Sequence, residues 1–165
     1  MARILCIDYG GKRTGLAVTD PLQIIASALT TIDTKELFSF LKKYIQSEPV
    51  ELILIGEPLG LDDQPTHATP LVKAAIQRLK KEFPQIPIET VDERYTSKMA
   101  SRAMIDMGMK KKDRQIKGNV DRIAATMMLQ EYLARLRSQS FFEREHLEER
   151  QIGLVQPTVL SIYQQ

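Results

Sequence analysis

Apolar residues in the first third of the chain recur at the short spacing typical of β-strands. Two such runs cover residues 3–9 and 14–19, and the glycine-bearing segment 10–13 between them favours a hairpin. A third run follows over residues 23–32. The pattern therefore predicts three antiparallel strands in the N-terminal part of the chain.

Farther along the chain, the apolar spacing alternates between the period of helices and that of strands. Leu37, Phe38 and Leu41 share one face of a predicted helix, and Pro49 follows its end. Three strands followed by alternating helices and strands are typical of an α/β layered domain. We expect three layers, with a mixed five-stranded sheet flanked by about four helices. The expected helices cover about 34–47, 66–83, 97–107 and 119–137, and the two further strands cover 51–56 and 86–91.

The C-terminal residues differ in composition from the rest of the chain. The segment FFEREHLEER carries four Glu against two Arg, a local charge of −2, and the final GLVQPTVLSIYQQ shows no clear period. We therefore expect a domain over residues 1–138 and a C-terminal extension over 139–165. The extension would consist of a short helix and a tail that is disordered or packs on a partner.

Composition and charge restrict the class of protein only weakly. With 43% hydrophobic and 27% charged residues the chain is typical of globular proteins, and a net charge of +2 selects no partner. The single cysteine, Cys6, excludes an intrachain disulfide, and its apolar neighbours indicate a buried structural thiol. No apolar stretch predicts a signal peptide or a membrane span. We expect a cytoplasmic protein that does not contact a membrane.

Three carboxylates stand at the ends of predicted elements: Asp8, Glu93 and Asp121. Asp121 shares a helical stripe with Ala124 and Ala125, whose small side chains would let that helix approach the sheet near Asp8. Three carboxylates at one place cannot all ionise cheaply unless a cation neutralises them. Oxygen ligands without a His or Cys cluster favour Mg²⁺ or Mn²⁺ over zinc. Two such ions can activate water for phosphodiester hydrolysis, so the pattern indicates a metal-dependent nuclease.

Each of these carboxylates also has a purely structural interpretation. Asp8 is consistent with a turn residue that leads into Gly10. Glu93 is consistent with a surface acid paired to a neighbouring arginine. Asp121 is consistent with an acid that complements a helix N-terminus. Their joint placement favours the metal site over three unrelated structural roles.

Three spaced motifs match a known family. The sequences DYGGKRTGLAVTD, VDERYTS and KGNVDRIAA, with LQEYL after the third, together resemble the YqgF, or RuvX, family of pre-16S rRNA processing nucleases. The resemblance implies an RNase H-like fold related to the RuvC-type Holliday junction resolvases, with acidic metal ligands. Carried over residue by residue, it gives Asp8, Glu93 and Asp121 the catalytic, metal-binding positions. It also implies cytoplasmic trimming of the 5′ end of the 16S precursor.

The resemblance covers about residues 1–135 and does not assign a role to every segment. The loop after the fourth strand, GEPLGLDDQPTH, departs from the family pattern, so no substrate contact is carried over to it. Nothing is carried over to the tail beyond about Ser138. The two histidines, His67 and His146, lack a ligand-like spacing and are interpreted as structural or exposed.

A basic segment immediately before Asp121 is the expected substrate-binding feature. Residues 110–117 carry five basic side chains against one acid, a local charge of +4, and could guide a phosphate backbone to the site. A solvated loop is the structural alternative. Because aromatic residues are sparse near the motifs, we expect recognition of backbone and shape rather than of sequence. The candidate nucleic-acid-binding residues are Lys12, Arg13, Arg94, Lys110, Lys111, Lys112, Arg114 and Lys117.

Several functions remain open at the level of sequence. The first is a Mg²⁺- or Mn²⁺-dependent nuclease acting on precursor 16S rRNA or, alternatively, a Holliday-junction-resolvase-like DNA endonuclease. The second is a non-catalytic RNA-binding factor in ribosome assembly. A third arises because DYGGKRTGLAV also resembles the phosphate-binding hairpin of actin-like ATPases and sugar kinases, but those proteins enclose the nucleotide with a second similar domain. The sequence does not give the oligomeric state.

Overall fold

The computed structural model describes residues 1–58, 69–92 and 96–154 of the chain. Contacts within it divide the chain into two units, Met1–Tyr132 and Leu133–Gln165. The first unit contains the β-sheet and all of the predicted site residues. No helix in the described ranges is long and apolar enough to cross a membrane.

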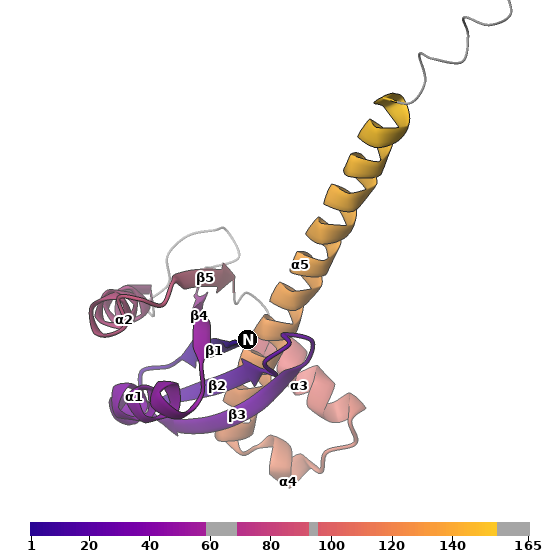
Figure 1. Cartoon of the computed structure of the whole chain (residues 1–165). Coiled ribbons are helices and arrows are strands. Elements are labelled where there is room, and N and C mark those ends of the chain that lie inside the picture. The colour runs from indigo at the N-terminus through magenta and orange to yellow at the C-terminus, as the bar shows by residue number, and fades with distance from the viewer. Residues whose placement is uncertain (59–68, 93–95, 155–165) are drawn as a thin grey trace, which may run out of the picture. The chain divides into compact units, whose positions relative to one another are not determined.

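A mixed sheet of five strands forms the centre of the first unit (Figure 1). The strand order is β3-β2-β1-β4-β5. Strand β1 pairs antiparallel with β2, and β2 pairs antiparallel with β3. Strand β4 lies parallel to both β1 and β5. The strands are β1 (Arg3–Tyr9), β2 (Arg13–Thr19), β3 (Ala26–Asp33), β4 (Val50–Glu57) and β5 (Ile88–Asp92).

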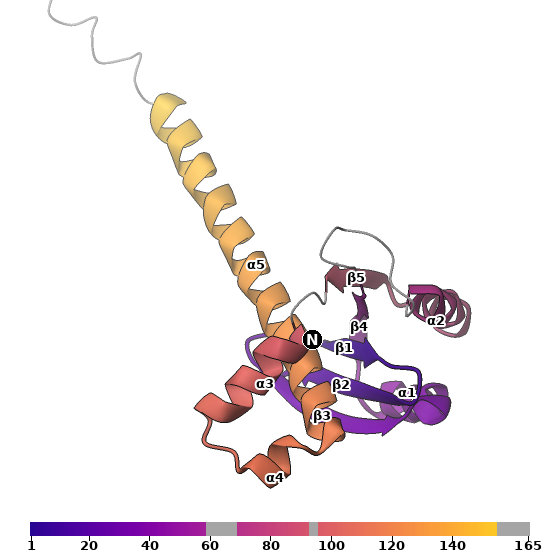
Figure 2. The ribbon, with the colours of Figure 1, turned by 180° about the vertical axis from the view of Figure 1, so that it is seen from behind.

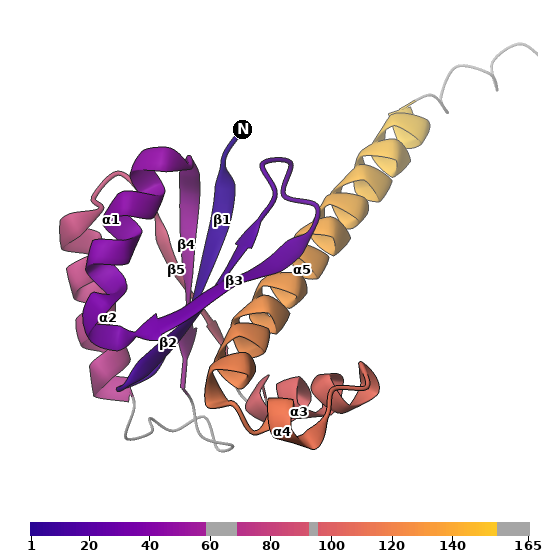
Figure 3. The ribbon, with the colours of Figure 1, turned by 90° about the horizontal axis from the view of Figure 1, so that it is seen from below.

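Helices cover both faces of the sheet, which gives three layers (Figure 3). Helices α1 and α2 lie on one face, and the first turns of α5 lie on the other, with α3 beside them (Figures 2 and 3). A 3₁₀ turn, Thr34–Glu36, precedes α1. The described helices are α1 (Leu37–Ser47), α2 (Thr69–Glu82), α3 (Thr96–Asp106), α4 (Lys111–Arg114) and α5 (Lys117–Leu154).

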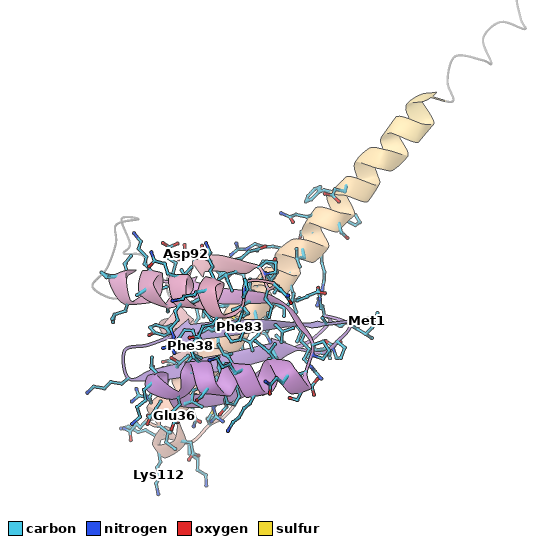
Figure 4. The ribbon with its side chains drawn as sticks, turned by 60° about the vertical axis from the view of Figure 1, so that its left-hand side comes forward. Met1, Glu36, Phe38, Phe83, Asp92 and Lys112 are labelled. Atoms are coloured by element: carbon cyan, nitrogen blue, oxygen red, sulfur yellow. The ribbon has the colours of Figure 1, made fainter. Side chains whose placement is uncertain are left out.

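Alternation along the strands builds the core beneath α1 and α2. Leu5 and Ile7 of β1 point to this face, since side chains two residues apart share one side of a strand. They pack in one cluster with residues of both helices, among them Phe38 of α1, and with Phe83 just past α2. Figure 4 labels Phe38 and Phe83 in the space between α1 and α2. This core fixes the sheet against which the site is built.

The other face of the sheet receives α5. Cys6 of β1 is fully buried, although its neighbours Leu5 and Ile7 supply the opposite core. On α5 the small residues Ala124 and Ala125 are buried, as are Met128 and Leu129 one turn farther on. The helical stripe predicted from the sequence therefore faces inward.

The mixed five-stranded sheet and its helical layers confirm the predicted fold class, with three differences in the elements. Strand β3 begins at Ala26, because the Asp20 carboxylate accepts hydrogen bonds from the amides of residues 22, 24 and 25 and holds them in a turn. These bonds, led by that from Ile25, lower the pKa of Asp20. The short helix α4 lies within the segment predicted to be a basic loop, so the described residues hold five α-helices rather than about four.

The third difference is the length of α5. The sequence predicted that this helix ends near Arg137 and that a separate short helix follows, whereas α5 continues to Leu154. A change in composition suggested the break, but residues 138–152 contain neither Gly nor Pro, the residues that end helices most effectively. The division into a domain over 1–138 and an extension over 139–165 stays a prediction.

Candidate active site

The candidate site lies at the end of the sheet where the parallel strands β1, β4 and β5 terminate. Because these strands run in the same direction, their carboxyl ends lie together at this edge of the sheet. Asp8 stands near the end of β1, and Asp92 is the last residue of β5, where Figure 4 labels it. Glu93 and Arg94, which follow Asp92 in the chain, lie outside the described residues. So do residues 59–68 of the loop after β4.

Asp8 belongs to the face of the sheet that α5 covers. It lies directly opposite Gly15 of β2 in the antiparallel register. Two residues earlier, Cys6 lies opposite Ala17, and both are fully buried on the side away from the α1 and α2 core. Directly paired residues point to the same face, with Cβ atoms about 5 Å apart. The Asp8 side chain is therefore a neighbour of whatever contacts Gly15.

The backbone of α5 at Asp121 is that neighbour. A Cβ atom built on Gly15 would lie 2.2 Å from the carbonyl oxygen of Asp121 and 2.9 Å from the amide nitrogen of Arg122. Only a glycine allows two backbones to approach so closely. Gly15 therefore brings Asp121 beside Asp8, although the two acids are far apart in the sequence.

A contact with β3 positions the start of the same helix. Thr31 pairs with Gly15 across the sheet, so Asp8, Gly15 and Thr31 form one row on this face. The Thr31 hydroxyl donates a hydrogen bond of 2.6 Å to the carbonyl oxygen of Gly118 in the first turn of α5. Asp121 is the fifth residue of α5, so it lies past the first turn, where an acid complements a helix N-terminus most strongly.

Farther along the helix, Tyr132 ties α5 to the edge strand β5. Its hydroxyl donates a hydrogen bond of 3.0 Å to the Glu89 carboxylate. Burial, and then this hydrogen bond, raise the pKa of Tyr132. The helix is thus held at β3, β2 and β5, which orients Asp121 from several sides.

Arg13, predicted to bind substrate, contacts Asp121. Its Nε lies 3.2 Å from Asp121 Oδ2. Arg13 and Gly15 are two residues apart on β2, so both face α5. The two side chains are 40% and 25% exposed, respectively. The ion pair therefore stands at the rim of the site, open to solvent on one side.

Hydrogen bonds to Thr34 hold the hairpin turn that carries Lys12 and leads into Arg13 of β2. The Thr34 hydroxyl donates to the carbonyl oxygen of Gly10 at 2.6 Å and lies 2.9 Å from the hydroxyl of buried Thr14. Its backbone amide donates to the carbonyl oxygen of Lys12 at 3.0 Å. These bonds order the hairpin, so the exposed Lys12 side chain projects from a fixed backbone.

The basic segment, residues 110–117, lies just before α5 and includes its first residue. Lys110, Lys111 and Lys112 are exposed, and Figure 4 shows Lys112 extending away from the ribbon. Arg114 is half-buried, and the Lys117 side chain lies outside the described residues. The Asn119 side chain donates to the carbonyl oxygen of Asp113 at 2.9 Å, and its own oxygen accepts from Arg122. Asn119 thus connects α4 to the turn of α5 that contacts Gly15.

The described residues supply only part of the predicted metal-ligand set. Among them no three His, Cys, Asp or Glu side chains lie close enough to hold a metal ion. Asp8 and Asp121 supply carboxylate oxygens, which suit Mg²⁺ or Mn²⁺. The third predicted ligand, Glu93, is outside the described residues. The donor chemistry at this edge fits a hard divalent ion.

Two residues that position the site were absent from the predictions. Gly15 carried a detectable signal, since glycine inside a strand marks close approach of another backbone. Thr31 carried none, because threonine is common in strands and its role depends on the pairing register. The contact between Arg13 and Asp121 likewise required the fold, because the two residues are 108 positions apart.

A solved structure with the same fold defines the class of protein. The chain superposes on a structure described as T. thermophilus RuvC in complex with Holliday junction substrate, with a TM-score of 0.50 and 16% identity. The match covers 82% of this chain and 96% of the RuvC chain. It confirms the RNase H-like fold that the motifs implied. At this level of identity the likeness defines the fold class alone, an RNase H-like domain.

The sequence comparisons identify the family. Residues 2–135 match the family model described as "RuvX: Holliday junction resolvase", so the chain belongs to the RuvX family. A Flavobacterium psychrophilum protein named "Putative pre-16S rRNA nuclease" is 53% identical over 135 residues, covering 82% of this chain and 98% of the relative. A Christiangramia forsetii protein of the same name is 53% identical over 133 residues, covering 81% and 98%. The resemblance inferred from the three motifs is confirmed.

Proposed function

We propose that the protein is a divalent-metal-dependent nuclease that trims the 5′ end of precursor 16S rRNA. The observation that carries the proposal is the contact of Gly15 with the backbone of Asp121, because it brings two acidic residues of separate motifs to one sheet edge. A nuclease of this type needs carboxylates in that arrangement to hold its metal ions. The structural interpretations of Asp8 as a turn residue and of Asp121 as an acid at a helix N-terminus do not require the two residues to lie close together.

Asp8, Glu93 and Asp121 are the residues we assign to the metal. Mg²⁺ and Mn²⁺ are the proposed ions, because the assigned ligands are all carboxylates. When bound, such ions lower the pKa of water and neutralise charge on the oxygens of a phosphodiester. Glu93 follows directly after β5, whose carboxyl end lies at the same edge as that of β1. The position of β5 therefore supports Glu93 as the third ligand.

The basic residues are proposed to hold the nucleic-acid backbone. Lys12 projects from the ordered hairpin next to Asp8. Three exposed lysines lie on the basic segment that precedes Asp121, namely Lys110, Lys111 and Lys112. Arg13, Arg94, Arg114 and Lys117 complete the proposed set. Point charges on exposed side chains contact phosphates regardless of base, so we expect binding that depends on backbone and shape.

The relatives favour RNA over DNA as the substrate. The proteins named for pre-16S rRNA are 53% identical and match over nearly their full length, whereas the RuvC chain in complex with Holliday junction substrate is 16% identical. The likeness to RuvC therefore supports the fold and not the substrate. Processing of precursor rRNA implies a cytoplasmic enzyme that meets ribosomal particles, and a single buried cysteine agrees with a reducing compartment.

The test is cleavage of a 5′-labelled precursor 16S fragment by the purified full-length chain, with Mg²⁺, with Mn²⁺ and with a chelator. We expect metal-dependent shortening at the 5′ end, and we expect Asp8→Asn to reduce the rate by at least about 100-fold. Asp106→Asn is the matched control, because Asp106 is an exposed acid that pairs with Arg102 on α3. Circular dichroism checks that both variants are folded.

The same assay separates the alternatives. A four-way DNA junction is included as a second substrate, and junction cleavage without RNA cleavage would establish the resolvase activity instead. Tight RNA binding without turnover in either metal would indicate a non-catalytic assembly factor. Light scattering with each substrate distinguishes a monomer, which is sufficient for end trimming, from the dimer that symmetric cuts in a junction require.

A further inference from the structure

We propose that Arg13 is a positioning residue that holds the Asp121 carboxylate in the metal-free protein and is displaced when a divalent ion binds there. This inference rests on the proposed assignment of Asp121 to the metal. It adds a role to Arg13 beyond phosphate contact, since the same guanidinium would neutralise the carboxylate before the metal does.

The geometry makes Arg13 a competitor for the ligand oxygen. Its Nε lies 3.2 Å from Asp121 Oδ2, so the guanidinium uses lone-pair density that a metal ion would need. Arg13 reaches Asp121 because it shares the face of Gly15, the residue in contact with the Asp121 backbone. The pair therefore forms on rigid elements, with a strand on one side and a helix on the other.

The ion pair is weak enough to be exchanged. The Arg13 side chain is 40% exposed and that of Asp121 is 25% exposed, so water screens their attraction. Pairs of this kind shift an equilibrium by a factor of about two to five. The attraction between a divalent cation and several carboxylates is stronger than this single ion pair. The cation also repels the guanidinium at short range. Solvent on the open side of the rim can accept the displaced side chain.

Two effects of Arg13 on metal affinity oppose each other, and their sizes decide the sign. Holding Asp121 in place assists binding, but an aspartate has few rotamers to lose, so this gain is small. Occupying the oxygen and repelling the ion weaken binding more strongly. Removal of the guanidinium should therefore increase the affinity for the metal, which is the reverse of the loss expected from a purely structural residue.

The experiment is isothermal titration calorimetry of Mn²⁺ into the metal-free full-length protein, without nucleic acid. Arg13→Gln removes the positive charge of the guanidinium and keeps a shorter polar side chain. Lys35→Gln is the matched control, because it removes the same charge from a side chain that is 80% exposed and lies outside the proposed binding set. We expect Arg13→Gln to bind Mn²⁺ about five- to ten-fold more tightly than the wild type. Lys35→Gln should stay within about two-fold of the wild type.

The outcomes separate this inference from the proposed function. If the wild type binds Mn²⁺ but the two variants have equal affinities for it, Arg13 has no specific effect on metal binding. The proposal that the metal displaces Arg13 is then wrong. Weaker binding by Arg13→Gln in a folded protein overturns it as well. If the wild type and both variants bind no Mn²⁺, the metal assignment fails, and this inference fails with it.

Discussion

Adding one methyl group at Gly15 should disrupt the site while leaving both acidic residues in the chain. In Gly15→Ala the new Cβ would lie 2.2 Å from the carbonyl oxygen of Asp121 and 2.4 Å from its carbonyl carbon. Both atoms belong to the backbone of α5, so no side-chain rotation can relieve the contact. The helix must move away from β2, and it carries Asp121 away from Asp8.

The size of the effect follows from that distance. Ordinary contacts of a Cβ begin at 3.4 Å, so α5 has to shift by more than 1 Å at Asp121. A displacement of about 1 Å in a catalytic group can cost about 100-fold in rate. The overpacking itself costs about 1–3 kcal/mol in the free energy of unfolding, which corresponds to roughly 2–12 °C in Tm for a chain of this size. We therefore expect a folded protein with little activity.

The measurement combines metal-dependent cleavage of a labelled precursor RNA with urea denaturation. Gly11→Ala is the matched control for stability, because within the described ranges its new Cβ would meet only the Cδ1 atom of Leu71, at an ordinary 3.8 Å. Full activity and unchanged stability in Gly15→Ala would refute the close approach of α5 to β2. A loss of activity without any loss of stability would contradict the overpacking cost of about 1–3 kcal/mol.

Two further predictions concern an ion pair between α1 and α2 and the lysines at the start of α4. Glu82 of α2 pairs with Arg78 at 2.7 Å and with Lys42 of α1 at 3.2 Å, and the hydrogen bond from Arg78 lowers the pKa of Glu82 below 4.5. A lowered pKa contributes its full stabilisation above the unfolded value and loses it as the pH falls through the folded-state value. Glu82→Gln should therefore destabilise the protein at pH 7, and the difference from the wild type should shrink as the pH falls below 4.5, which urea denaturation across that range measures. Replacing all three lysines 110–112 by Gln should reduce the salt dependence of single-stranded RNA binding by about 2 in the log–log slope, if each contacts one phosphate. An unchanged slope in anisotropy titrations would exclude those contacts. The matched control is a triple variant with Gln at three exposed lysines of α2, namely Lys73, Lys80 and Lys81.

Much of the fold could be predicted from the sequence because its strands carry strong periodic signals. In β1, Leu5 and Ile7 belong to one core, and Cys6 between them is buried on the other side, so an unbroken apolar run indicated a strand covered on both faces. The stripe of α5 around Ala124 and Ala125 was equally regular, and both residues are buried as predicted. Local pattern was sufficient wherever a whole element had one consistent environment.

Other features depended on contacts that no local pattern contains. Strand β3 begins later than predicted because Asp20 binds the amides of a turn that includes exposed, strand-forming Ile24 and Ile25. The partner of Arg13 could not be predicted, because the ion pair requires the register of β1 with β2 and the docking of α5 on β2. These contacts are set by tertiary structure, which single-sequence periodicity does not encode.

The placement of the two acids explains how the protein carries charge next to its core at little cost. Along β1, the face beneath α5 changes from fully buried Cys6 to half-buried Asp8, and along α5 it changes from buried Ala125 back to half-buried Asp121. Both carboxylates therefore stand where the interface between sheet and helix opens to solvent. A carboxylate that retains water avoids most of the penalty of burial, while its neighbours on the same strand or helix remain rigidly packed. The position in which these acids cost least stability is thus also the position in which a metal ion and a phosphate can reach them.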